Sequence, residues 1–305
     1  MECELSKVKS LNSEIIFFVF LQGAWKVWLN IGLESTKVSF NEAEKISDEL
    51  YIPSQAFLTA LVQTFPALFQ HIHARFTNED LQKLCDVLMN AVMVPVHSES
   101  TPYIMSTMSD SLLTPLHDGV LDCIELLQKE AISGTTPLKT IFCAVFKQLL
   151  SFSKFSCSPP YYESRKRSGP SSVEWVSMNY IPFGEKALSV AIKLYQQTAS
   201  DERVIEGQIL HEIIKALSLP LGLKYKCMSA STWKLAITSL MSALHWGLPV
   251  ARKHLKEFAN IWNDLSDTLD KFLFPKRFHF EFVPPQTISD HFYLQRLSSG
   301  RPRFG

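Results

Sequence analysis

The sequence is poor in glycine and has no excess of either charge. Only 11 glycines occur among 305 residues, which is few for a doubly wound nucleotide-binding fold or an all-β sandwich. The 30 basic residues balance 30 acidic ones, so the chain lacks the positive field by which most nucleic-acid-binding proteins associate. Its hydrophobic content of 46% suffices for a packed core and excludes wholesale disorder. We expect about two domains or one extended array, and no nucleic-acid partner.

The sequence also lacks a disulfide framework, a Cys-x-x-Cys zinc pair and a membrane span. Its six cysteines are scattered, and several lie in apolar runs, as reduced thiols of a cytosolic protein do. The one membrane-like run, Ile15 to Leu21, covers only about 10 Å as a helix, against roughly 20 residues for a bilayer. It has neither the basic start nor the cleavage site of a signal peptide. We therefore expect a buried helix there, in a chain that is cytoplasmic or peripheral to a membrane.

Apolar residues recur at helical spacing from Pro53 onward, which predicts an all-α protein. Thr77 and Asp80 predict a capping box at the start of one helix. Thr136 and Pro137 have the residue types of a cap and a first helical position at the start of another. About eight helices are expected, on the apolar stripes at 57–72, 81–92, 113–127, 138–152, 187–195, 209–217, 233–244 and 255–272.

Two features interrupt this pattern. Gly247 and Pro249 predict the end of the seventh helix. The segment 153–172 holds three prolines and a glycine, which is typical of a loop or linker. We therefore predict an apolar N-terminal segment (1–22), a helical-repeat half (23–152), a Pro/Ser/basic linker loop (153–172), a second helical-repeat half (173–274) and a divergent, poorly ordered tail (275–305).

Each predicted helix is apolar over a broad face that it cannot bury alone. Stacking pairs of helices side by side removes those faces from water. Eight helices exceed one four-helix bundle, so we expect an irregular HEAT- or armadillo-like helical-repeat solenoid, that is, an α-α superhelix. A compact orthogonal all-α domain is the alternative.

The motifs of common enzymes are missing. No Gly-x-Gly-x-x-Gly, Walker-type, Gly-x-Ser-x-Gly or His-Glu-x-x-His sequence occurs, so we expect no enzyme, no cofactor and no metal site. His71 and His73 are two residues apart, which points them in different directions on a helix, and we interpret them as helix-end polar residues. Asp201 and Glu202 open a helix, where the helix dipole favours negative charge.

The one candidate contact site is the basic cluster Arg165, Lys166 and Arg167 in the predicted linker. Such a cluster binds anionic lipid, acidic protein or nucleic acid, or is simply solvated. The six tryptophans lie in or beside apolar stripes, and we interpret them as packing residues, with some lining a partner groove. They are Trp25, Trp28, Trp175, Trp233, Trp246 and Trp262.

Six sequence blocks follow one another along the chain. They read AWxxW at 24–28 with IGxESTK at 31–37, IPSQAFLTAL at 52–61 with FPALFQHI at 65–72, DLQKL at 80–84, EWV at 174–176 with NYIPF at 179–183, STWKLA at 231–236 and GLPVAR at 247–252. From roughly Gly23 to Phe274 they resemble the carboxy-terminal part of the Mon-two (monensin-sensitivity) family. These are large helical-repeat scaffolds, similar to the big Arf guanine-nucleotide exchange factors but without the catalytic domain. Since the family proteins are several times longer, we expect a fragment or short product with a foreign tail after Phe274.

The resemblance implies a non-enzymatic scaffold or adaptor in protein transport, peripheral to trans-Golgi and endosome membranes. The partners it implies are a Dopey-type scaffold, an Arf-like small GTPase and a phospholipid flippase. It transfers no catalytic, cofactor-binding or metal-binding residue. Two alternatives stay open, namely stimulation of nucleotide exchange on an Arf-like GTPase and direct lipid binding through Lys154 and Arg165–Arg167.

Overall fold

The computed structural model describes residues 20–37, 52–97, 113–133, 141–160, 175–176, 178–223 and 229–274. The α-helices are one at residues 20–35, then α2 (Gln55–Ile72), α3 (Asn78–Met93), α5 (Pro115–Ser133), α6 (Ile141–Ser153), α7 (Ile181–Thr198), α8 (Glu202–Glu206), α9 (Ile209–Gly222), α10 (Ala230–Ala251) and α11 (Leu255–Leu273). Two short 3-10 helices, η2 (His73–Arg75) and η4 (Lys154–Ser156), and an antiparallel pair of two-residue strands, β1 (Val96–His97) and β2 (Trp175–Val176), complete the described elements. The predicted all-α class is confirmed, and the described residues of the eight apolar stripes lie on helices, except Leu113, which precedes α5.

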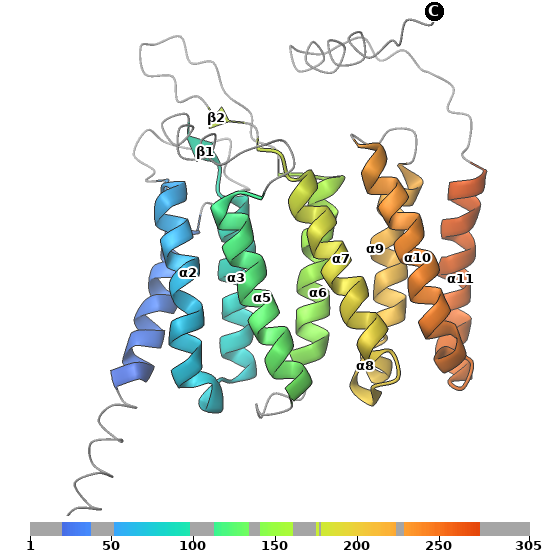
Figure 1. Cartoon of the computed structure of the whole chain (residues 1–305), viewed down its shortest axis with the longest axis horizontal. Helices are drawn as coiled ribbons and strands as arrows, with labels where there is room; N and C mark the ends of the chain where they lie inside the picture. Colours follow the sequence, from blue (N-terminus) through green and yellow to red (C-terminus); the bar gives the residue numbers. More distant parts are fainter. Residues whose placement is uncertain are drawn as a thin grey trace, which may run out of the picture.

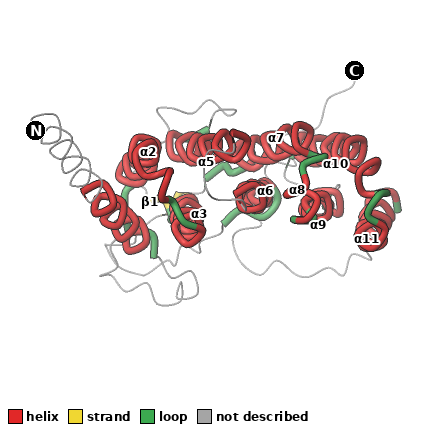
Figure 2. Tube along the Cα trace, turned by 90° about the horizontal axis from the view of Figure 1, so that it is seen from below, coloured by secondary structure: helices red, strands yellow, loops and turns green. Residues whose placement is uncertain are grey.

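The helices stand side by side in an elongated row of two layers (Figure 1 and Figure 2). One layer contains α2, α5, α7 and α10, and the other contains α3, α6, α9 and α11. The helix at 20–35 lies at one end of the row and α11 at the other. The main contacts join neighbours only, such as α2 with α5, α6 with α7, α7 with α10 and α9 with α11.

Polar residues begin several helices as the sequence predicts. The capping box is present, because the Thr77 hydroxyl accepts from the Asp80 amide at 3.1 Å and the Thr77 amide donates to Asp80 Oδ2 at 2.9 Å. The hydroxyls of Ser54 and Ser229 also accept from backbone amides at the starts of α2 and α10, without a reciprocal bond. Asp201 caps α8, as expected of an acidic residue at a helix start. Thr136 and Pro137 lie outside the described residues.

The predicted end of α10 at Gly247 is wrong, because the helix continues to Ala251. Gly247 is buried, and a Cβ at this position would overlap the Tyr195 hydroxyl and lie 2.8 Å from Leu210 Cδ2. The glycine therefore serves the close approach of three helices and not the end of one. Pro249 lies inside the last turn of α10, where it removes one backbone hydrogen bond of the helix but does not end it.

One hydrophobic core runs along the whole row, from Trp25 in the first helix to Leu265 in α11. It crosses the predicted linker, because α6 and α7 pack directly on each other. Phe155, within the predicted linker, is buried in η4 and its ring lies 5.7 Å from that of Tyr180. Residues 161–172 and the tail at 275–305 are not among the described ones, so the division into two halves, a linker and a tail stays a prediction.

Two further expectations concern the apolar N-terminal run and the cysteines. Of the run Ile15 to Leu21, expected as a buried helix, only Phe20 and Leu21 are described; both are helical, but Phe20 is exposed. Cys85 and Cys123 are buried and free, and burial raises the pKa of each thiol to about 12. They pack as small apolar side chains, as the sequence predicts.

Candidate functional site

The predicted contact residues Arg165, Lys166 and Arg167 lie outside the described residues. The residues on either side of that segment pack against one another. Phe155 precedes it in η4, and its ring approaches those of Tyr180 and Phe183 at 5.7 and 6.4 Å. Phe155, Tyr180 and Phe183 form an aromatic cluster between η4 and the start of α7.

This aromatic cluster contains a buried histidine. His117, in the first turn of α5, stacks on Phe183 with ring centroids 4.5 Å apart and lies 5.3 Å from Tyr180. Complete burial lowers the pKa of His117 to about 3, so the ring is neutral. The Tyr180 hydroxyl donates to the carbonyl of Val92 at 2.9 Å and ties the start of α7 to the end of α3.

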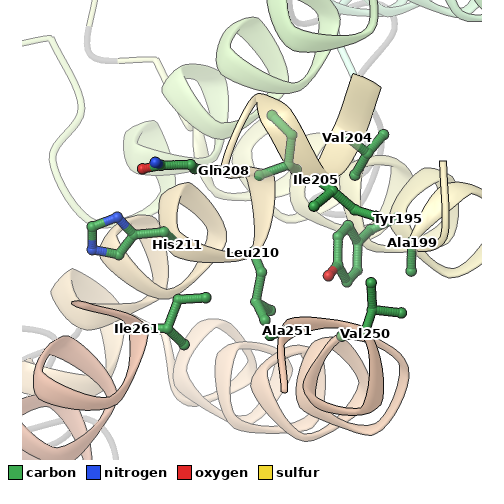
Figure 3. A pocket seen from close by; sticks show the side chains of 12 residues that line it. Tyr195, Ala199, Val204, Ile205, Gln208, Leu210, His211, Val250, Ala251 and Ile261 are labelled. Atoms are coloured by element: carbon green, nitrogen blue, oxygen red, sulfur yellow. The ribbon is translucent and has the colours of Figure 1, made fainter. Parts of the chain in front are cut away.

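A shallow pocket lies among α7, α8, α9, α10 and α11 (Figure 3). Its empty volume is about 400 Å³, part of which is open solvent. Most lining side chains are apolar, and the polar ones are Tyr195, Gln208 and His211. Tyr195 and His211 lie at opposite edges of the pocket (Figure 3).

The polar groups of the pocket are held by local structure. His211 Nε2 and Asp264 Oδ2 are 2.6 Å apart and join α9 to α11. Gln208, which precedes α9, has a left-handed backbone with φ of 53° and ψ of 36°. It is the one non-glycine residue with positive φ in the described part of the chain, and such a conformation costs roughly 1 kcal/mol. Burial raises the pKa of the Tyr195 hydroxyl, so it stays protonated.

The chemistry of the pocket is mainly apolar. Its lining offers aliphatic surface with three polar groups at the edges, and within the described residues no three His, Cys, Asp or Glu side chains gather as metal ligands. His73 caps the end of α2 and contacts the Gln70 carbonyl at 2.9 Å, which confirms its interpretation as a helix-end residue. Asp201 binds the Arg203 guanidinium at 2.8 Å, and this hydrogen bond lowers its pKa.

The tryptophans divide into a buried and an exposed group. Trp25 and Trp28 stack 5.3 Å apart in the core, as predicted. Trp25 Nε1 donates to Asp80 Oδ1 at 2.8 Å, and Trp28 Nε1 donates to the Leu61 carbonyl at 3.0 Å. Burial raises the pKa of Asp80, but hydrogen bonds from Trp25 and Thr77 outweigh it and hold that pKa below its ordinary value.

Two other tryptophans do not belong to the core, and for them the prediction that some tryptophans line a partner groove stays a prediction. Trp246 on α10 and Trp262 on α11 are 49% and 55% exposed. Trp262 stacks on Phe258 with centroids 6.2 Å apart, and Trp246 meets the ring of His245 edge-on. Both lie at the α10–α11 end of the row, where no further described helix covers them.

The pocket residues were not predicted from the sequence. Tyr195 lies in an apolar stripe and reads as core, while Gln208 lies between two helices with no turn motif. Gly247 was singled out in the sequence, but as the end of a helix and not as a pocket residue. No described helix is both long and apolar enough to cross a bilayer.

Comparison with known proteins gives one consistent relationship. A family model described as the C-terminal region of Mon2 protein matches residues 4–286. The chain is 56% identical over 272 residues to Protein MON2 homolog of Drosophila melanogaster, a match that covers 83% of this chain and 16% of that protein. It is 41% identical over 281 residues to Protein MON2 homolog of Homo sapiens, covering 87% of this chain and 16% of that protein.

A more distant relative gives the same picture. Monensin-resistant homolog 2 of Caenorhabditis elegans is 30% identical over 278 residues, covering 82% of this chain and 17% of that protein. The chain therefore spans about one sixth of the length of these relatives. No solved structure matches it significantly.

Proposed function

We propose that this chain, which belongs to the Mon2 family and corresponds to its C-terminal region, acts as a non-enzymatic scaffold or adaptor in transport between the trans-Golgi and endosomes. Family membership is the observation that carries the proposal. The site of action would be the cytoplasmic side of those membranes, with the protein bound peripherally. The partners that follow are a Dopey-type scaffold, an Arf-like small GTPase and a phospholipid flippase.

The physical basis of such a role is the long exposed surface of the helical row. Two layers of helices whose main contacts join neighbours are typical of HEAT- and armadillo-like solenoids, and we interpret the row in that way. An elongated array presents far more surface for its mass than a compact domain, so several proteins can bind along it at once. The apolar pocket beside α10 then serves as one place where a partner inserts an apolar side chain.

Cargo sorting tests the proposal in cells that lack the endogenous family protein. Recycling of a Golgi–endosome cargo is expected to slow, and the intact protein should restore it. A version lacking the region that matches residues 20–286 should leave recycling slow. Normal recycling after depletion, or full rescue without this region, would contradict the proposed role.

Nucleotide exchange is a distinct candidate and is measured separately. If the scaffold proposal holds, purified chain leaves the release of a fluorescent nucleotide from an Arf-like GTPase unchanged. Acceleration in proportion to the concentration of the chain would instead favour a regulator of exchange.

Lipid binding through the basic cluster is tested by flotation on anionic vesicles. The variant with Arg165, Lys166 and Arg167 all changed to Gln should float less if the cluster contacts lipid. A matched control changes three exposed helix lysines, Lys147, Lys193 and Lys215, to Gln. An equal loss in both variants would show that only the total charge matters.

A further inference from the structure

The end of the row formed by α10 and α11 exposes apolar side chains that the core does not cover. Met241 on α10 is 61% exposed, and Trp262 and Leu273 on α11 are 55% and 59% exposed. Three large apolar side chains at one end of a row contrast with the buried apolar faces between its inner helices. Such a patch indicates a surface that another segment covers.

The exposed residues belong to one stripe on each helix. On α10 the stripe consists of Ile237, Met241, Leu244 and Leu248, and on α11 of Phe258, Trp262, Leu269 and Leu273. The intervals of three, four and seven residues place each stripe along one side of its helix. We call the two stripes together the α10–α11 face.

Both stripes lie next to the contact between the two helices. The rings of Trp233 and Phe272 meet there, with centroids 6.3 Å apart. At 100° per residue, Met241 lies about 80° around α10 from Trp233, and Trp262 lies about 80° around α11 from Phe272. Around the axis of α10, exposed Met241 and buried Ala243 lie on opposite sides of Trp233. The α10–α11 face is therefore one continuous surface on the outer side of this contact.

The order of helices along the row shows which segment belongs on this face. The chain alternates between the layers. α3 is followed by α5, α6 by α7 and α9 by α10, and the second helix of each pair packs against the first. α11 occupies the next position in the first layer, and within the described residues it has no successor. The residues that follow it in the chain are 275–305.

This segment has the length and composition to cover the face. α11 contains 19 residues and is about 28 Å long, so the 31 residues from 275 to 305 can turn and run back along it. They include Phe278, Phe280, Ile288, Phe292 and Leu297 as apolar residues. They also carry five basic and two acidic residues, whereas α11 carries four acidic and two basic ones. The net charges are therefore opposite in sign, although Asp264 contacts His211 and Asp267 pairs with Lys271.

We propose that residues 275–305 of this chain dock back on the α10–α11 face and cover Trp262 and Met241. Its apolar residues would cover the face on the side where the second layer has no further described helix, whereas the sequence predicts a poorly ordered tail. This docking is independent of the proposed function, because it rests on the exposed stripes and on the order of the helices.

Photo-crosslinking in the full chain tests the docking directly. The photoreactive residue p-benzoylphenylalanine replaces Trp262 in one variant and Asn260, an exposed polar position on another side of α11, in the matched control. Mass spectrometry of the digested monomer is expected to show crosslinks from position 262 to peptides within 275–305. The control variant, with the photoreactive residue at position 260, should give no crosslinks to these peptides.

Mixing isotopically light and heavy chains separates the possible partners of the face. Crosslinks between light and heavy peptides would show that a second copy of this chain covers it, and this result would overturn the proposal, as would the absence of any crosslink from position 262. A second variant, Met241→Glu with the photoreactive group kept at 262, should reduce the intramolecular crosslink if the face acts as a unit. Far-UV circular dichroism checks that each variant keeps its helix content.

Discussion

His117 is a titratable side chain placed among aromatic rings, and its burial makes stability depend on pH. The folded chain keeps the ring neutral down to about pH 3, whereas the ordinary pKa is 6.5. Between these values the unfolded chain binds the additional proton. The contribution of His117 to the free energy of unfolding is therefore fully present above pH 6.5. It falls as the pH decreases toward 3, by about 1.4 kcal/mol per pH unit.

We expect the free energy of unfolding to fall by about 2 kcal/mol between about pH 7 and about pH 5 through this one group. The H117L variant should lack this part of the pH dependence, measured by urea unfolding at both values. Phe183→Leu is the control, because it removes the stacked ring but keeps the histidine. It should lower stability at both pH values and leave the slope as it is. An unchanged slope in H117L would contradict the assignment.

Trp25 combines core packing with a hydrogen bond to a carboxylate. The indole donates to Asp80 at 2.8 Å, and the same carboxylate closes the capping box of α3. Trp25→Phe leaves part of the ring but removes the donor, so we expect a loss of about 2–3 kcal/mol in the free energy of unfolding. Chemical unfolding measures it. Trp246→Phe, at a half-exposed tryptophan, should cost less than about 0.5 kcal/mol, and equal losses would show that the Asp80 contact adds nothing.

At the scale of helices, Gly247 sets how closely α10 approaches α7 and α9. A methyl group there meets the Tyr195 hydroxyl and Leu210, so Gly247→Ala should lower the free energy of unfolding by about 1–3 kcal/mol. A methyl group at Gly23 would meet no neighbouring atom within 4 Å, and Gly23→Ala should raise stability by about 0.5–1 kcal/mol. Adding Tyr195→Phe to Gly247→Ala should recover part of the loss. Thermal and urea unfolding of the unaltered chain, the two single glycine variants and the double variant measure these differences in stability.

Helix positions followed from the sequence because each helix buries one side. Leu81, Leu84, Leu88 and Val92 are all buried in α3, and they were the residues of its predicted stripe. A capping box depends only on residues three positions apart, so the box of Thr77 and Asp80 was predictable from the sequence. Gly247 was not, because a glycine after an apolar run is the same signal whether it ends a helix or admits a neighbour.

The pocket and the exposed tryptophans depended on information that no local pattern holds. The pocket exists only because Tyr195, Leu210 and Ile261 come together from three helices. Trp262 lies in an apolar stripe like a core residue, and its exposure follows from the place of α11 at the end of the row. Periodicity tells which side of a helix is apolar, but it does not tell how many neighbours that side receives.

For the whole molecule, the continuous core predicts that damage at its centre spreads in both directions. Phe183 in α7 packs against Phe152 of α6 and His117 of α5. Phe183→Ala should cost about 3–5 kcal/mol and should speed hydrogen–deuterium exchange in α2 and α3 as well as in α9 and α10. Leu265→Ala in α11 is the matched change at one end, and it should affect α9 to α11 first. Faster exchange confined to residues 178–273 in the Phe183 variant would instead support two independent halves.

The neighbour-only contacts of the row also have a mechanical consequence. A pull on its two ends is carried in series through successive helix–helix interfaces, so a small rotation at each one adds to a large change in end-to-end distance. The helices themselves keep their hydrogen bonds while this happens. We therefore expect the molecule to extend more easily along the row than across it.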